Sequence, residues 1–148
     1  LAAVEILETY GVRSEIYSAT SYGELRREGL DCERNNRLNP SDARQIPYVE
    51  QLLGDGTYPT IAVSDNQIAV PDMIRQWVGG DYSVLGTDGF GRSDTRPNLR
   101  KFFEIDAQNI TIAALSSLVR SKEIESDVFD KAMKSLGISR DRNDITSL

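Results

Sequence analysis

The stretch at residues 83–103, SVLGTDGFGRSDTRPNLRKFF, decides how this chain is organised. Its opening apolar pair is typical of a buried strand, and Pro97 favours the first turn of a following helix. Between them, Gly89 and Gly91 allow the backbone to adopt positive φ. Strand, glycine-rich corner and helix in this order indicate an α/β unit, in which ligands or partners usually meet the carboxyl edge of the sheet. The glycine corner (residues 86–96) is therefore the first candidate site.

Strand-like and helix-like patterns alternate along the rest of the chain. Residues 1–10 predict the end of an amphipathic helix, and residues 12–18 alternate apolar and polar side chains like a strand near the sheet edge. The β-branched run at 60–64 predicts a central strand, and residues 71–78 predict a helix. Because such connections pair strands in parallel through right-handed crossovers, we expect an α/β domain with helices on both faces of the sheet.

Helix ends are marked by local signals. Gly11 is placed to stop the first helix. Ser21 and Glu24 fit a capping box that opens a short helix, which Gly29 is expected to end, with a further helical turn within 30–38. Other helices are expected at 48–53, at 97–103, at 107–121 with Asp106 as its cap, and at 126–136 with Ser126 as its cap.

The length fits one domain. We expect a single α/β domain at residues 1–138 and a polar carboxyl-terminal tail at 139–148. A helix followed at once by a strand is the second half of a βαβ unit, so its first strand is expected upstream of Leu1, and the chain reads as a fragment of a larger protein. It begins without Met and shows no signal peptide, which fits the same expectation.

Composition restricts the classes of partner. Seventeen basic against twenty-three acidic residues give a net charge of −6, which disfavours nucleic acid and anionic membranes as partners. The sequence holds no apolar run of the roughly twenty residues that a membrane helix requires. One cysteine, Cys32, excludes an internal disulfide, so we expect a cytoplasmic protein.

Catalytic signals are sparse. The chain has no histidine, which removes the commonest general base and metal ligand. Cys32 lies between Asp31 and Glu33, whose charges raise a thiol pKa instead of activating it. Asp88 and Asp94 flank the glycine corner and could form an acid/base pair or hold magnesium, although Asp in turns more often bonds nearby backbone amides. We therefore expect no catalytic, cofactor-binding or metal-binding residue in the chain.

The glycine corner admits two interpretations. Its backbone amides beside Arg92 could form an anion-binding nest, which would make the chain a stand-alone binding module for a small anion held between Gly86 and Arg96. The corner matches neither a Walker loop nor a dinucleotide fingerprint. An apolar ring at a loop tip is usually buried against something, which favours a protein interface. The predicted interface residues are Gly89, Phe90, Gly91, Arg92 and Asp94.

Four long strings carry a family resemblance. They are AAVEIL at 2–7, YSATSYGELRREGLDCER at 17–34, IPYVEQL at 46–52 and VLGTDGFGRSDTRPNLRKFFEIDA at 84–107. In this order and spacing they resemble the carboxyl-terminal domain of the homodimeric, thiamine-diphosphate-dependent pyruvate dehydrogenases. The chain departs from that pattern at Asn35, where tryptophan is usual, and at Asn39, where histidine is usual.

The resemblance implies a transketolase carboxyl-terminal-domain fold, which is a three-layer α/β/α sandwich with a mostly parallel or mixed central sheet. It also implies a non-catalytic role in dimer and domain packing. In such enzymes two other domains bind thiamine diphosphate and magnesium, so the cofactors belong to the full-length enzyme and not to this chain. The enzyme oxidatively decarboxylates pyruvate and passes the acetyl group to the lipoyl arm of a dihydrolipoyl acetyltransferase. Implied partners are the remaining domains, the second subunit and that acetyltransferase. A rival interpretation, a self-sufficient enzyme that uses Asp88 and Asp94, lacks both a nucleophile and a histidine base.

Overall fold

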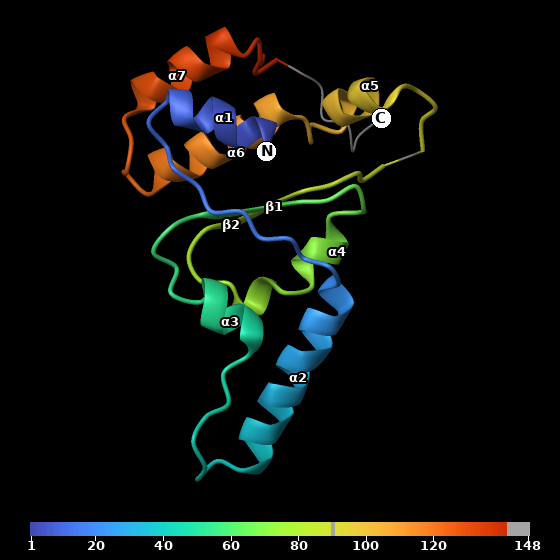
Figure 1. The fold of residues 1–148 in the computed structure, drawn as a ribbon, viewed down its shortest axis with the longest axis vertical. Coiled ribbons are helices and arrows are strands. Elements are labelled where there is room, and N and C mark those ends of the chain that lie inside the picture. Colours follow the sequence, from blue (N-terminus) through green and yellow to red (C-terminus); the bar gives the residue numbers. More distant parts are fainter. Residues whose placement is uncertain (90, 142–148) are drawn as a thin grey trace.

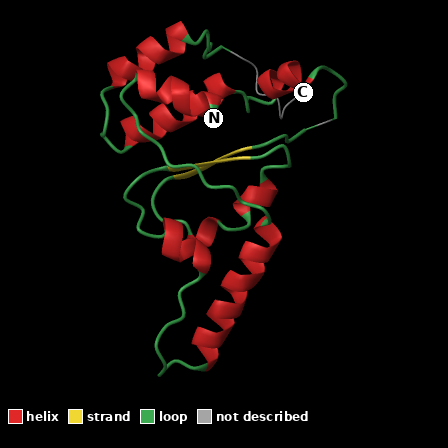
Figure 2. Cartoon of the chain, viewed as in Figure 1, coloured by secondary structure: helices red, strands yellow, loops and turns green. Residues whose placement is uncertain are grey.

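The chain folds into helices on both faces of a small parallel sheet. A computed structural model describes residues 1–89 and 91–141 (Figure 1). The helices are α1 (Ala2–Thr9), α2 (Tyr22–Leu38), α3 (Tyr48–Leu53), α4 (Ala69–Asp72), the 3₁₀ helix η1 (Arg75–Trp77), α5 (Arg96–Phe102), α6 (Ala107–Arg120) and α7 (Ser126–Ser135). The strands are β1 (Thr60–Val63) and β2 (Tyr82–Leu85). The expected α/β architecture is confirmed, since α1, α6 and α7 lie on one side of the strands and α2, α3 and α4 on the other (Figure 2).

The two strands pair in parallel, as the alternation of elements predicts. Thr60 lies opposite Tyr82 in the register. The Thr60 N–H donates to the Asp81 carbonyl at 2.8 Å, and the Ser64 N–H donates to the Leu85 carbonyl at 3.0 Å. Because alternate residues of a strand face opposite edges, the amides of the intervening residues 61 and 63 point away from β2.

Each face of the sheet has its own hydrophobic core. The core on the α2 and α3 side consists of Val49, Ala62, Ile74, Trp77 and Tyr82. The core among α1, α6 and α7 consists of Leu7, Leu115 and Ala132. The strands therefore separate two packed helical layers, which is the layered arrangement that the sequence predicts.

The strand predicted at residues 12–18 is wrong. The structure assigns no strand there, and Ile16 and Tyr17 keep 57% and 53% of their surface exposed. A strand exists only when a neighbouring strand takes up its backbone N–H and C=O groups, and the alternating side chains supply no such neighbour. Within the described residues the sheet has only β1 and β2.

The short helix predicted to end at Gly29 is also wrong, because α2 continues through Gly29 to Leu38. Gly29 is buried, and a Cβ placed on it would lie 2.5 Å from Cζ2 of the Trp77 ring. Glycine is needed here for a close approach and not for a helix end. The predicted cap at the start of α2 is confirmed, since the Ser21 Oγ accepts from the Glu24 N–H at 3.2 Å.

Two further helix predictions need correction. The helix expected at 71–78 is divided into α4 and η1, because Ile74 leaves the helical region with φ −104° and ψ 1°. The cap residue of α7 is Glu125, and Ser126 is its first helical residue. The cap of α6 is confirmed, because the Asp106 carboxylate accepts from the Asn109 N–H at 2.9 Å. Of the tail predicted at 139–148, residues 142–148 lie outside the described residues.

Substituting Gly29 by alanine should destabilise the chain. The added Cβ would overlap the Trp77 ring, and overpacking of this kind costs about 1–3 kcal/mol in the free energy of unfolding. Urea unfolding followed by circular dichroism measures this loss. Gly23→Ala is the control in the same helix, because its nearest neighbouring atom would lie 3.9 Å away. Equal midpoints for both variants would contradict the close contact between Gly29 and Trp77.

Hydrogen exchange should alternate along β1. The amide of Ala62 points toward β2 by the strand period, so we expect it to exchange slowly, together with the amide of Ser64. The amides of Ile61 and Val63 point toward the free edge and should exchange much faster. Residue-resolved exchange measured by NMR tests this order. Uniform protection along the strand would contradict the register.

Candidate protein interface

The glycine corner begins where two loops meet at the carboxyl edge of the sheet. The Thr87 N–H donates to the Asn66 carbonyl at 2.9 Å, and the Thr87 hydroxyl donates to the Asp65 carbonyl at the same distance. Gly86 is buried against this loop, where a Cβ would lie 2.7 Å from the Asn66 carbonyl oxygen. The corner is therefore anchored to the residues that follow β1.

Beyond this anchor the corner is exposed. Gly89 adopts φ 107°, a conformation that favours glycine. Gly89, Gly91, Arg92 and Asp94 are all exposed, and a Cβ on Gly91 would meet no atom within 4 Å. Phe90, the expected apolar tip, lies outside the described residues. The described part of the predicted interface thus lies together on one accessible loop.

The two carboxylates of the corner hold backbone groups. The Asp88 carboxylate accepts from the Ile68 N–H at 2.7 Å, next to the start of α4. The Asp94 carboxylate accepts from the Thr95 N–H at 2.7 Å and from the Asn98 side-chain amide at 2.8 Å. The bond from Asn98 leads the causes that lower the pKa of Asp94, so this group stays ionised at neutral pH. Of the two roles weighed for these residues, the geometry favours the structural one.

Arg92 is directed at an aromatic ring. Its guanidinium carbon lies 4.6 Å from the centre of the Phe102 ring, which is a cation–π arrangement between the corner and α5. Phe102 in turn packs edge-on against Phe103 with ring centres 5.0 Å apart. The contact orients the only arginine among the predicted interface residues along α5.

The described residues do not fit a magnesium diphosphate site. Magnesium is held in proteins by carboxylates and phosphate oxygens with near-octahedral geometry. No group of three or more His, Cys, Asp or Glu side chains in residues 1–89 and 91–141 could hold a metal ion. The two acidic side chains of the corner already bond to the backbone.

The thiol of Cys32 is in an unactivating environment. Its Sγ donates to a Glu28 carboxylate oxygen at 3.3 Å. Burial first, and then the hydrogen bond and charge of Glu28, raise the pKa of Cys32, which confirms the expected direction. The neighbour Glu33, expected to act on the thiol, instead accepts from the Trp77 indole N–H at 2.9 Å. The charge of Asp31, which the sequence also predicted to act on the thiol, does raise its pKa, whereas the larger effect of Glu28 was missed.

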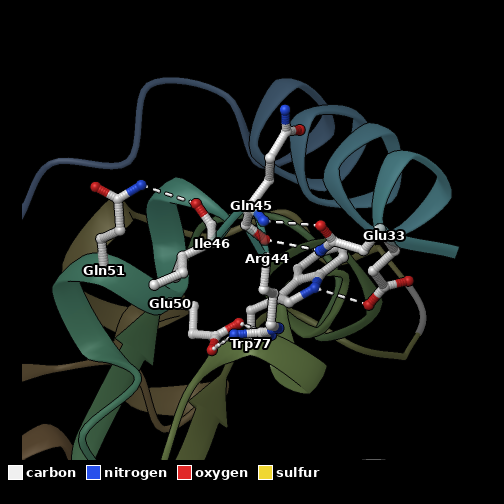
Figure 3. A network of polar contacts seen from close by, with 8 residues as sticks. Glu33, Arg44, Gln45, Ile46, Glu50, Gln51 and Trp77 are labelled. Atoms are coloured by element: carbon white, nitrogen blue, oxygen red, sulfur yellow. Dashed lines mark hydrogen bonds and ion pairs between the residues drawn. The ribbon is translucent and has the colours of Figure 1, made fainter. Parts of the chain in front are cut away.

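A second polar network joins α2 to α3. The connection (residues 39–47) is held at Gln45 by two hydrogen bonds with the Asn36 side chain (Figure 3). The Gln45 carbonyl accepts from the Asn36 Nδ2 at 2.8 Å, and the Gln45 N–H donates to the Asn36 Oδ1 at 2.7 Å. Arg44 forms two hydrogen bonds of 2.7 Å with Glu50. No local sequence signal marks these contacts, because each partner lies several residues away on another element.

The first turn of α3 is held by the same network. The Glu28 carboxylate accepts from the Tyr48 N–H at 3.1 Å and 3.3 Å. The Gln51 side chain donates to the Ile46 carbonyl at 2.8 Å (Figure 3). The connection therefore has a defined shape although most of it is exposed to solvent.

Comparison with known proteins shows to which family this chain belongs. The sequence profile of the transketolase-like C-terminal domain family matches residues 1–106, which is most of the chain. The chain belongs to this family. Within residues 1–89 and 91–141, no helix is long and apolar enough to cross a membrane.

Three relatives of this transketolase-like domain are much larger proteins. The pyruvate dehydrogenase E1 component of Escherichia coli K12 is 44% identical over 142 residues, which is 95% of this chain and 16% of the relative. Those of Corynebacterium glutamicum and Mycolicibacterium smegmatis are 47% and 44% identical over 133 residues, 89% of this chain and 14% of each relative. The chain thus spans about a sixth of the length of these enzymes, and the family resemblance seen in the sequence is confirmed.

Cys32 should react slowly with iodoacetamide. Because burial and Glu28 raise its pKa, less thiolate is present at pH 8 than for a free cysteine, and the rate should rise only at higher pH. Glu28→Gln removes the charge and should increase the rate at pH 8, by up to about tenfold for each pKa unit. Glu24→Gln is the control in the same helix. Mass spectrometry measures the rates, and an unchanged rate in Glu28→Gln would contradict the assigned cause.

Proposed function

We propose that this chain is the non-catalytic carboxyl-terminal domain of a pyruvate dehydrogenase E1 component, where it supports domain and dimer packing. The observation that carries this proposal is 44% identity with the E. coli relative along 95% of the chain. The geometry agrees with it, because the carboxylates of the corner hold backbone groups and the thiol has a raised pKa. Such a domain contributes shape and contact surface instead of reacting groups.

The activity belongs to the whole polypeptide. In this proposal the full-length enzyme oxidatively decarboxylates pyruvate and transfers the acetyl group to a lipoyl arm of dihydrolipoyl acetyltransferase. Thiamine diphosphate, bound with magnesium by other domains, supplies the electron sink for this chemistry. We propose that the full-length enzyme is a homodimer. We also propose that it is cytoplasmic, which agrees with the single free cysteine of this chain.

The glycine corner is the proposed contact with a neighbouring domain or subunit. Its described residues from Gly89 onward are exposed, its backbone is anchored at Thr87 and Asp88, and Arg92 is oriented by the Phe102 ring. An exposed loop with a fixed base loses little conformational entropy on binding, which favours an interface role.

The proposal predicts activity only in the longer polypeptide. The gene that encodes this chain should continue upstream of residue 1, and its full-length product should decarboxylate pyruvate in the presence of thiamine diphosphate and magnesium. The 148-residue chain should give no heat of binding with thiamine diphosphate, since its described residues do not fit the group. In the full-length enzyme, Phe90→Ala should shift the dimer dissociation midpoint to higher protein concentration.

Controls separate this proposal from its rival. Met73→Ala alters an exposed apolar side chain outside the corner and should leave dimerisation unchanged. Titration of the 148-residue chain with inorganic phosphate tests the stand-alone anion-binding module, and tight binding lost in Arg92→Ala would favour that module instead. Absence of pyruvate turnover in the full-length product would overturn the proposed function.

A further inference from the structure

The outward face of α3 carries apolar side chains that nothing in the described residues covers. Tyr48 and Leu52 lie one helical turn apart with 54% and 42% of their surface exposed, while Val49 points inward and is buried. Ile46, just before the helix, is 46% exposed. We call Ile46, Tyr48 and Leu52 the α3 face. Apolar side chains grouped in this way on a surface mark interaction sites.

The α3 face is fixed in shape before any partner arrives. The Glu28 carboxylate accepts from the Tyr48 N–H. The Gln51 side chain donates to the Ile46 carbonyl (Figure 3). A segment that is ordered in advance pays little conformational entropy when it binds. A surface that only faced solvent would not need several side-chain hydrogen bonds to hold exposed apolar groups in place.

Two of the charges beside the α3 face, those of Arg44 and Glu50, neutralise each other. Arg44 and Glu50 form a two-bond ion pair, and the hydrogen bond from Arg44 leads the causes that lower the pKa of Glu50. A pair of this kind leaves little net charge for recognising an anionic or cationic partner. The α3 face is therefore best matched by an apolar, uncharged partner surface.

We propose that the α3 face packs against the part of the parent polypeptide that lies outside these 148 residues, through an apolar surface of that part. This inference rests on the proposed function. The chain covers 16% of the E. coli relative, so most of such a polypeptide is available to cover the face. A second copy of the chain is the less suitable occupant, because each copy carries a net charge of −6 and the face offers no unpaired charge to offset the repulsion.

Hydroxyl-radical footprinting tests the α3 face. In the 148-residue chain, Tyr48 and Leu52 should be oxidised readily, because both are exposed. In the full-length polypeptide the same residues should be protected severalfold. The double variant Tyr48→Ser/Leu52→Ser should lower the thermal midpoint of the full-length polypeptide and leave that of the 148-residue chain unchanged. Met73→Ser is the matched control, since Met73 is exposed to a similar extent, 40%.

The outcomes separate this inference from the proposed function. The full-length protein could turn over pyruvate while Tyr48 and Leu52 stay as reactive as in the 148-residue chain. This result would overturn the inference and keep the proposed function. A 148-residue chain that dimerises in analytical ultracentrifugation, with the dimer lost in the double variant, would also overturn it in favour of a second copy. Protection of both residues in the active full-length protein supports it.

Discussion

The parallel pairing of β1 with β2 is the constraint on which the rest of the structure depends. Parallel neighbours cannot be joined by a tight hairpin, so the chain must cross between them through α4 and η1. Two strands of four residues are too few to be stable alone, and each face must be covered. Val49 and Trp77 cover the strand residues Ala62 and Tyr82 on one face, and Leu115 belongs to the core of the helical layer on the other.

Parallel pairing also determines where the glycine corner lies. Both strands end at the same edge, so the loops that follow them meet, and Asp88 from one loop holds the Ile68 amide of the other. Thr87 adds two further bonds between these loops. The exposed residues from Gly89 onward therefore extend from a fixed base. The interface role proposed for the corner follows from this base and not from glycine flexibility alone.

The sequence predicts those features that neighbouring residues determine. The caps at Ser21 and Asp106 and the β-branched run of β1 are local, and the structure confirms them. The strand expected at 12–18 required a partner strand that the pattern could not supply. Gly29 looked like a helix end because its actual neighbour, Trp77, is far along the chain. The α2–α3 network was missed for the same reason.

The distribution of polar and apolar groups argues for a domain whose function lies in its contacts. Polar side chains of the kind that enzymes use for catalysis are engaged in shaping the backbone, as Asp88, Asp94 and Glu28 show. Apolar side chains that a self-contained domain would bury, such as Tyr48 and Leu52, are exposed on a pinned helix. Burial of apolar area is the main driving force of association. This distribution therefore favours a domain that buries its exposed apolar side chains against another part of a larger protein.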